Sequence, residues 1–406
     1  MKINIFYSLI TTLSRLVSGF ILLFVLSRYL SLEDFGLFTF SLVVSSLLVL
    51  LVEYGYNIKL SKDTAHNSSK ISELTTNSLI VKFSLISVVL FILFILYLNE
   101  IYNIKEFQII AIMTVATILN SFANHFLIPY RSIDKFNIEA KYVFFNNIMI
   151  FVLVSFVAIK TQDIFLIVLV FLLVKMLYLI FTTRLFQKDF GFTFEKFSLI
   201  KEYKKSLPYA VHVAVGAMYL NVDTIILKEY VPLEEIGVYQ AGLKALGAAT
   251  ILMGVLNNVL LPKFTQYART DSVVFAKMVF KFNVISMLTG LVIASIVNVF
   301  SESLVLLVYG EKFIELVPYV WLFSIIIFLR YFGLVYGVLL TVSNRQKIRT
   351  YTVIFTLFFI LISDLFVVPG YKIFGALVVL IIAHIILNMI YMLFTYKEYK
   401  TIFLKV

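Results

Sequence analysis

The stretches LSRYLSLEDFG at 26–36 and LKEYVPLEEIG at 227–237 align with each other without a gap. Each stretch joins the first two apolar runs of a set of six. An even number of runs in each set indicates two halves in the same orientation, a repeat typical of secondary transporters. Chance similarity between two helix-end loops is the alternative. The identical pairs are Leu26 and Leu227, Tyr29 and Tyr230, Leu32 and Leu233, Glu33 and Glu234, and Gly36 and Gly237.

The apolar runs around these stretches are long enough to cross a bilayer, whose hydrocarbon core needs roughly 20 apolar residues per helix. They lack the alternation of a membrane β-strand. The sequence predicts an all-α integral membrane protein of about twelve transmembrane helices. These would form two six-helix halves, residues 1–200 and 201–406, around a central cavity. The expected spans are 8–30, 37–58, 77–98, 107–128, 141–160, 164–186, 207–228, 237–261, 278–300, 317–340, 350–368 and 374–396.

The composition excludes a water-soluble fold. Of the 406 residues, 61% are hydrophobic and 14% are charged, whereas soluble domains have about 45 to 50% apolar and about 25% charged residues. The chain has no cysteine, which rules out disulfides, thiolate metal sites and cysteine nucleophiles. No P-loop motif is present, so an ATP-driven exporter would need a separate ATPase. We expect no catalytic residues, no metal and no cofactor.

The positive charge indicates how the chain lies in its membrane. The net charge is +11, and most Lys and Arg residues lie in short gaps between apolar runs. Cytoplasmic loops carry the excess of Lys and Arg. We therefore expect a multi-pass protein with both termini in the cytoplasm, and no nucleic-acid partner. Two basic clusters contribute much of the asymmetry: Lys201, Lys204 and Lys205, and Arg345, Lys347 and Arg349.

Ionisable residues inside the spans are candidate functional residues, because each costs a few kcal/mol in hydrocarbon. Lys82 and Asp364 lie about one helical turn from a span end, where we expect their side chains to reach the interface. The full set is Arg15, Glu53, Lys82, Lys175, Asp223, Lys244, Arg330 and Asp364.

Two possible ion pairs lie at opposite faces of the membrane. Arg15 and Glu53 have similar depth on consecutive spans near the cytoplasm, and Asp223 and Lys244 have similar depth near the exterior. Pairs that form in one state and break in another would suit an alternating gate, so Glu53 and Asp223 are candidates for gating or ion coupling. A permanent salt bridge that neutralises both partners is the alternative.

Lys175 and Arg330 lie near the middle of their spans without an acidic residue at matching depth. A protein lumen or an anionic ligand would have to solvate them, and phosphate suits both, since Arg binds it bidentately and Lys as a point charge. A hydrogen-bonded structural role is the alternative. His212 and His384 are expected to be packed residues rather than proton carriers.

The stretch SLPYAVHVAVGAMYLNVDTIILKEYVPLEEIGVYQAGLK at 206–244 resembles the Wzx-type flippases. These form the polysaccharide branch of the multidrug/oligosaccharidyl-lipid/polysaccharide (MOP) exporter superfamily. Leu32 to Phe38, Glu53 to Gly55, Leu261-Pro262 and Tyr309 to Phe313 are similar to further family features. The positions that carry the main resemblance are Ser206, Pro208, Asn221, Asp223, Glu235, Gly237 and Tyr239.

The resemblance implies a transporter rather than an enzyme. Such a flippase carries an undecaprenyl-diphosphate-linked oligosaccharide, such as an O-antigen repeat unit, across the bacterial inner membrane for lipopolysaccharide biosynthesis. Relatives use cations on helices one and eight for the diphosphate, which points to Arg15 and Lys244. With Lys175 and Arg330 these form the expected substrate cavity.

The resemblance also implies partners and leaves two alternatives. The expected partners are the lipid-linked substrate, membrane lipids, and a glycan polymerase with its chain-length regulator. One alternative is a multidrug or cation antiporter of the same superfamily, although the basic residues outnumber the acidic ones within the spans. The other is a glycan polymerase or ligase, which the short external loops disfavour.

Overall fold

A computed structural model describes residues 2–195 and 197–403, and within these ranges every regular element is helical. The chain forms two compact units, Met1–Ala217 and Met218–Val406. Their boundary falls inside α8 (Leu199–Lys228). The sequence places the boundary at residue 200, because the loop before this helix separates the two sets of apolar runs.

Unit 1 is a bundle of long apolar helices. α1 packs against α6, and α5 packs against both α2 and α7. Side chains from α5, α6 and α7 form a buried cluster of Ala123, Leu127, Tyr130, Val143 and Tyr178. The unit contains α1 (Lys2–Tyr29), α2 (Leu32–Glu53), α3 (Tyr56–His66), η1 (Ser68–Lys70), α4 (Ile71–Leu98), α5 (Ile104–Ser132), α6 (Phe136–Thr161), α7 (Ile164–Asp189) and the first part of α8.

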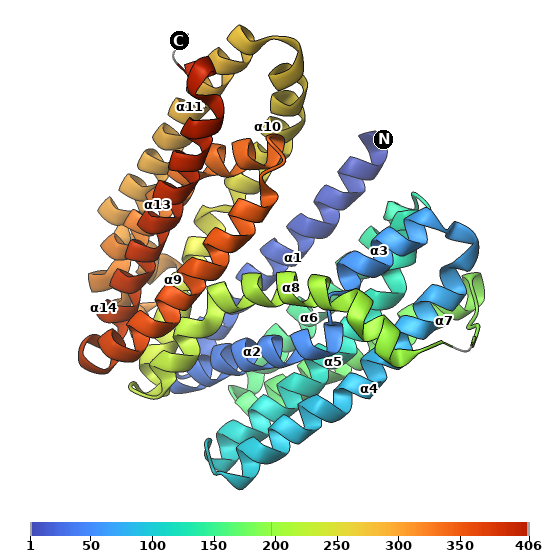
Figure 1. Ribbon diagram of the computed structural model, residues 1–406. Coiled ribbons are helices and arrows are strands. Elements are labelled where there is room, and N and C mark those ends of the chain that lie inside the picture. The colour runs from blue at the N-terminus through green and yellow to red at the C-terminus, as the bar shows by residue number, and fades with distance from the viewer. Residues whose placement is uncertain (1, 196, 404–406) are drawn as a thin grey trace. The chain divides into compact units, whose positions relative to one another are not determined.

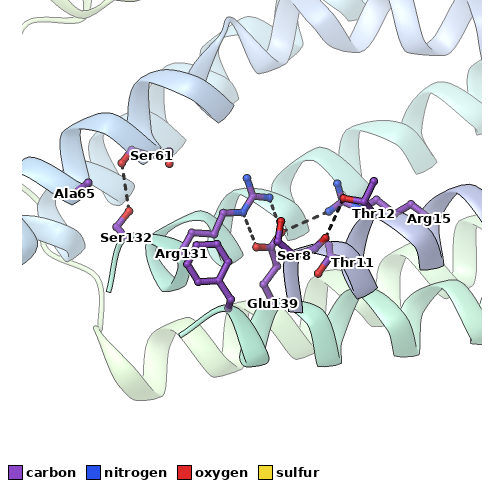
Figure 2. Close-up of a pocket in the computed structure, with 10 residues that line it drawn as sticks. Ser8, Thr11, Thr12, Arg15, Ser61, Ala65, Arg131, Ser132 and Glu139 are labelled. Carbon is purple, nitrogen blue, oxygen red and sulfur yellow. Dashed lines mark hydrogen bonds and ion pairs between the residues drawn. The ribbon is translucent and has the colours of Figure 1, made fainter. Parts of the chain in front are cut away.

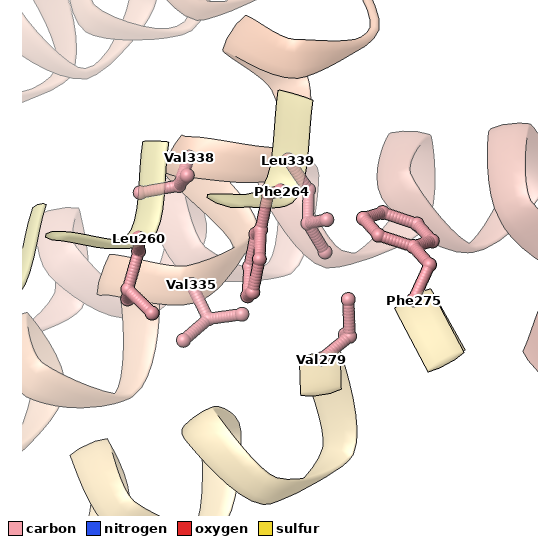
Figure 3. Close-up of a cluster of buried hydrophobic side chains, with 7 residues drawn as sticks. All are labelled: Leu260, Phe264, Phe275, Val279, Val335, Val338 and Leu339. Atoms are coloured by element: carbon pink, nitrogen blue, oxygen red, sulfur yellow. The ribbon is translucent and has the colours of Figure 1, made fainter. Parts of the chain in front are cut away.

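Unit 2 has its own core between α10, α11 and α13. Figure 3 shows the seven buried side chains of this core, Leu260, Phe264, Phe275, Val279, Val335, Val338 and Leu339. The unit contains the rest of α8, α9 (Leu233–Ala249), α10 (Ile251–Thr270), α11 (Ser272–Val299), α12 (Ser301–Val308), η2 (Glu311–Tyr319), α13 (Val320–Val342) and α14 (Gln346–Phe403).

The two repeated stretches have the same local structure. In each, a residue in extended conformation precedes the helix: Ser31 with φ −62° and ψ 160°, and Pro232 with φ −68° and ψ 167°. Acidic residues follow in the first turn of α2 and of α9, where they interact favourably with the helix dipole. Ser31 also accepts a hydrogen bond from the Asp34 amide, at 3.0 Å. The repeat therefore encodes the start of the second helix in each unit.

Eleven helices in the described part of the chain are long and apolar enough to cross a membrane. The last, α14, has 58 residues, and contains both of the last two predicted spans. Lys372 has a left-handed φ of 47° shortly after Pro369, and the ribbon reverses its direction at the bend between orange and red (Figure 1). Because α14 contains two of the predicted spans, the eleven helices agree with the predicted twelve-helix membrane fold.

The turn after α2 is tight. Tyr54 and Gly55 both have left-handed backbone conformations, with φ of 45° and 72°. The backbone of Tyr209 and Ala210 in α8 lies so close to Gly55 that a Cβ there would overlap it. α3 therefore begins as a separate helix, and the helix of the second predicted span ends at Glu53 rather than at residue 58.

Candidate functional site

A cavity of about 520 Å³ lies between four elements of unit 1. α1 contributes mainly hydroxyl side chains, and the end of α5 and the start of α6 contribute charged ones (Figure 2). Its volume is within the range of about 300–1,000 Å³ typical of small-molecule sites. The lining residues are Ser8, Thr11, Thr12, Arg15, Ser61, Ala65, Arg131, Ser132, Phe136 and Glu139.

Two arginines meet one carboxylate at this cavity. Arg131 donates from Nε and Nη2 to the two carboxylate oxygens of Glu139, both at 2.5 Å. The Nη2 atom of Arg15 lies 3.9 Å from Oε1 of the same carboxylate. The Glu139 side chain is 4% exposed, whereas that of Arg15 is 44% exposed. Arg131 therefore holds the carboxylate, and Arg15 keeps donors that face the cavity.

Asparagines on α5 connect Arg15 with Lys175. Arg15 Nη2 donates to Asn124 Oδ1 at 3.2 Å, and Lys175 Nζ donates to Asn120 Oδ1 at 2.8 Å. Asn124 Nδ2 in turn donates to the backbone oxygen of Asn120. Lys175 is buried, and the ring centroid of Phe171 lies 5.3 Å from its ammonium group. Unit 1 thus places two of the predicted substrate cations on one polar row.

The predicted pair between Arg15 and Glu53 is not formed in this structure. Arg15 approaches Glu139 instead, and Glu53 accepts a hydrogen bond from Asn57 at 3.1 Å. Glu53 ends α2, whereas Glu139 lies in the first turn of α6, the main packing partner of α1 in the bundle. The depth of Arg15 in the membrane could not identify Glu139 as its neighbour. That neighbour is determined by which helices pack against α1.

Lys82 does not reach the membrane interface, contrary to the expectation from its place near a span end. It is fully buried and donates to the Oγ atom and the backbone oxygen of Ser121, at 2.8 and 3.1 Å. One turn away on both helices, Ser78 Oγ lies 2.8 Å from Nε2 of the buried His125. Sequence reasoning overlooked this polar cluster. The matching four-residue spacing of Ser78 and Lys82 and of Ser121 and His125 is the signal that could have found it.

Arg330 in unit 2 has a neutral partner. Its Nε donates to Nε2 of His384 at 3.2 Å, and Nδ1 of His384 lies 2.8 Å from the Leu380 backbone oxygen. His384 is buried, as predicted, whereas His212 is exposed. Arg330 is half-buried, and among the described residues it makes no ion pair. Its hydrogen-bond partner is therefore a neutral imidazole rather than a carboxylate.

Asp223 also has different neighbours from those predicted. It accepts hydrogen bonds from the Tyr239 hydroxyl and from the amide of Thr224, the latter at 2.8 Å. It makes no ion pair with Lys244, whose ammonium group has no hydrogen-bond partner among the described residues. The predicted pair is thus absent here, because residues of α8 and α9 next to Asp223 satisfy its oxygens.

Asp364 is fully buried, so the expectation that it reaches the interface is also wrong. Neither carboxylate oxygen has a hydrogen-bond partner among the described residues. Asp223 and Asp364 are thus two buried carboxyl groups of unit 2. Within the ranges 2–195 and 197–403, no group of three or more acidic or histidine side chains is arranged as a metal site.

Comparisons with known proteins identify the sequence group and the fold. A sequence profile described as "Polysaccharide biosynthesis protein" matches residues 2–268. No protein of curated function matches the chain significantly. An inward-facing MATE family multidrug resistance transporter of the MOP superfamily is 11% identical, with a TM-score of 0.72, over 97% of this chain and 95% of that one.

Two further solved structures have the same fold. The lipid II flippase MurJ, in an inward closed conformation, is 16% identical with a TM-score of 0.71, over 98% of this chain and 90% of that one. A MOP superfamily transporter from Pyrococcus furiosus is 14% identical with a TM-score of 0.61, over 98% and 94%. At these identities the likeness establishes the fold, a twelve-helix membrane protein in two halves.

Proposed function

We propose that this chain, which belongs to the polysaccharide biosynthesis protein family of the MOP superfamily, is a flippase for undecaprenyl-diphosphate-linked oligosaccharide. The sequence profile covers well over half of the chain, which confirms the family expected from residues 206–244. The solved structures that share its fold include a multidrug resistance transporter and a lipid II flippase. The substrate, an O-antigen or similar repeat unit, and the bacterial inner membrane are part of the proposal.

The observation that carries the proposal is the set of cations inside apolar helices. Lys175 and Arg330 bond to neutral acceptors, Asn120 and His384, so their positive charge is not cancelled by these contacts. Lys244 has no hydrogen-bond partner among the described residues. Holding such charges within a membrane is costly. An anionic diphosphate that arrives during transport would supply the missing negative charge.

The cavity beside Arg15 supports a route from the cytoplasm. If both termini are cytoplasmic, as the basic loops predict, then the start of α1, the end of α5 and the start of α6 all lie on that side. The hydroxyl groups and Arg15 that line the cavity suit a polar headgroup. In this proposal the headgroup binds here first, while the polyprenyl tail stays in lipid.

We propose that unit 2 provides the ion coupling. Asp223 and Asp364 are buried in the same unit, and Asp364 has two oxygens without hydrogen-bond partners among the described residues. Burying a carboxylate without a counter-charge is unfavourable. A proton or a monovalent cation would relieve this cost, and its release would favour another conformation. Glu53, at the end of α2, stays a candidate for gating in unit 1.

The same carboxyl groups favour a second candidate function, a cation antiporter. In that case the acidic groups of unit 2 would bind the transported cation itself. The two functions differ in what the basic residues do. Arg15, Lys175, Lys244 and Arg330 are required for a diphosphate substrate but are dispensable for a cationic one.

Complementation of a flippase-deficient bacterial strain tests the proposal. We expect the chain to restore surface polysaccharide and to lower the accumulated lipid-linked repeat unit in the inner leaflet. The repeat unit that reaches the surface would identify the substrate. If the chain is present in the membrane and raises resistance to cationic drugs without restoring polysaccharide, the antiporter is correct instead.

A further inference from the structure

The segment between α7 and α8 is fixed to unit 1 where it begins. Ser72 Oγ donates to the backbone oxygen of Gly191 at 2.9 Å. The ring of Phe192 packs against those of Phe126 and Phe186, with centroids 6.0 and 5.4 Å away. These contacts set the point at which the segment leaves the helix bundle, so the residues that follow have a defined place beside unit 1.

The first two turns of α8 present one face to the rest of unit 1. Nζ of Lys59 donates to Oε2 of Glu202 at 3.0 Å, and the Tyr203 hydroxyl lies 2.6 Å from Oγ of Ser84. Ser206, one turn further along α8, is fully buried. Because residues three or four apart share a helix face, these contacts leave the opposite face of the two turns pointing away from the bundle.

Apolar and basic side chains are exposed together here. Ile200 in the first turn of α8 is 68% exposed, and Phe194 in the segment before the helix is 75% exposed. Three exposed lysines follow in the same two turns. The rest of the described chain therefore leaves these side chains uncovered. We call this set the linker surface: Phe194, Ile200, Lys201, Lys204 and Lys205.

The linker surface is positively charged. Lys205 pairs with Glu202, with 3.2 Å between Nζ and Oε1. Lys201 and Lys204 make no ion pair within the described part of the chain. Glu195 is an exposed carboxylate in the same segment, and it is not paired with either lysine there. Clusters of lysine such as this one are attracted to the anionic lipids of a cytoplasmic leaflet.

The position of the linker surface in the chain fits a membrane interface. It occurs between two helices that are long and apolar enough to cross a membrane, Ile164–Asp189 and Leu199–Lys228. If the basic loops face the cytoplasm, this surface does too. Segments that combine lysines with large apolar side chains lie in the interface, where the apolar groups enter the boundary between headgroups and acyl chains. In water, Phe194 and Ile200 would remain exposed, which is unfavourable.

We propose that the linker surface binds an anionic phospholipid, with the lipid phosphate on Lys201 and Lys204 and with Phe194 and Ile200 among the upper acyl chains. Lys205 contributes less, because it already has a carboxylate partner. A lipid with a net negative headgroup, such as phosphatidylglycerol, fits this surface, whereas the ammonium group of a zwitterionic lipid opposes the lysines. The bound lipid is not transported, so the proposal goes beyond the flippase activity.

Fluorescence quenching in reconstituted vesicles tests the proposal. The chain has a single tryptophan, so Trp321→Phe with Phe194→Trp leaves one reporter, on the linker surface. The purified full-length variant is placed in dioleoyl phosphatidylcholine that contains increasing fractions of brominated phosphatidylglycerol or brominated phosphatidylcholine. The two quenching curves give the relative association constants of these lipids at the reporter. We expect phosphatidylglycerol to bind about five-fold more tightly.

A second reporter position is the matched control. Phe91 in α4 is also largely exposed, at 62%, and no lysine or arginine occurs between residues 83 and 98. Phe91→Trp with Trp321→Phe should therefore be quenched equally by the two brominated lipids. If this reporter shows the same preference for phosphatidylglycerol, the preference belongs to the whole chain and the assignment to the linker surface is wrong.

Lysine variants in the reporter background assign the headgroup contact. Lys201→Gln with Lys204→Gln removes both unpaired charges, so the two lipids should then bind about equally. Lys204→Gln alone gives a smaller change in the same direction if the double variant does not fold. Lys277→Gln with Lys281→Gln removes the same charge from exposed positions of α11, and should leave the preference unchanged. An equal loss in both double variants would mean that only the net charge matters.

Two results would overturn the proposal. A reporter at position 194 that neither brominated lipid quenches would show that the segment is a linker surrounded by water. Equal association constants for the two lipids in the parent variant would show that the segment contacts the membrane without selecting an anionic headgroup. Both measurements are made without transport, so the lipid site and the proposed flippase activity can fail separately.

Discussion

Nε of Arg330 donates to Nε2 of His384, 3.2 Å away. For this bond to form, Nε2 must carry the lone pair and Nδ1 must carry the proton, which it donates to the Leu380 backbone oxygen. The imidazole is therefore neutral, and it orients the guanidinium without cancelling its charge. An arginine held in this way is ready for an anionic ligand.

Arg330→Ala should abolish surface polysaccharide in the complementation assay while the protein remains in the membrane. Arg330→Lys keeps the charge but not the planar fork, so we expect it to retain part of the activity, about ten-fold below wild type. The control is Lys347→Ala, an exposed basic residue of the same unit, which should behave as wild type. Normal polysaccharide with Arg330→Ala would remove this residue from the substrate site.

Exchanging the charges of Asp223 and Lys244 tests whether they pair in another state. Asp223 already accepts hydrogen bonds from Tyr239 and Thr224, and a lysine there would oppose these donors. We therefore expect Asp223→Lys with Lys244→Asp to be as inactive as Asp223→Lys alone. Recovery of polysaccharide by the double variant would instead establish a functional ion pair between them.

Replacing Lys82 should not weaken the fold. Its ammonium group is buried against Ser121 without a hydrogen-bonded carboxylate, and exchanging buried ionic groups for apolar ones is often neutral or stabilising by about 1–4 kcal/mol. Lys82→Met with Ser121→Ala, which also removes the hydroxyl, should melt at the wild-type temperature or above it. The exposed Lys62→Met is the control, expected within about 0.5 kcal/mol of wild type. A large drop in melting temperature would mean that Lys82 stabilises the fold.

Gly55→Ala should be strongly destabilising. Its φ of 72° is unfavourable for alanine by about 1–2 kcal/mol, and the added Cβ would overlap the backbone of Tyr209 and Ala210. Gly191 has a similar φ of 70° with open space around its Cβ position, so Gly191→Ala isolates the cost of conformation alone. Thermal unfolding in detergent compares the two. Equal losses would show that the close approach at Gly55 adds nothing.

The spans, the repeat and the family could be predicted because they depend on local patterns. Hydrophobic length defines a membrane helix, and the sequence from Leu32 to Gly36 encodes a helix start that recurs at Leu233 to Gly237. Partners between helices could not be predicted, because depth along a span does not determine which helices touch. Arg15 therefore approaches Glu139 rather than Glu53, and Lys82 is bound by Ser121 rather than solvated at the interface.

Lys82 also has a consequence for biosynthesis. Its two hydrogen-bond acceptors both belong to Ser121 on the next helix, so α4 leaving the ribosome carries a charge that nothing in its own sequence yet satisfies. Insertion of α4 into lipid by itself would be costly. The translocon should therefore release α4 and α5 together as a hairpin, and truncation of the nascent chain before Ser121 should leave α4 exposed to degradation.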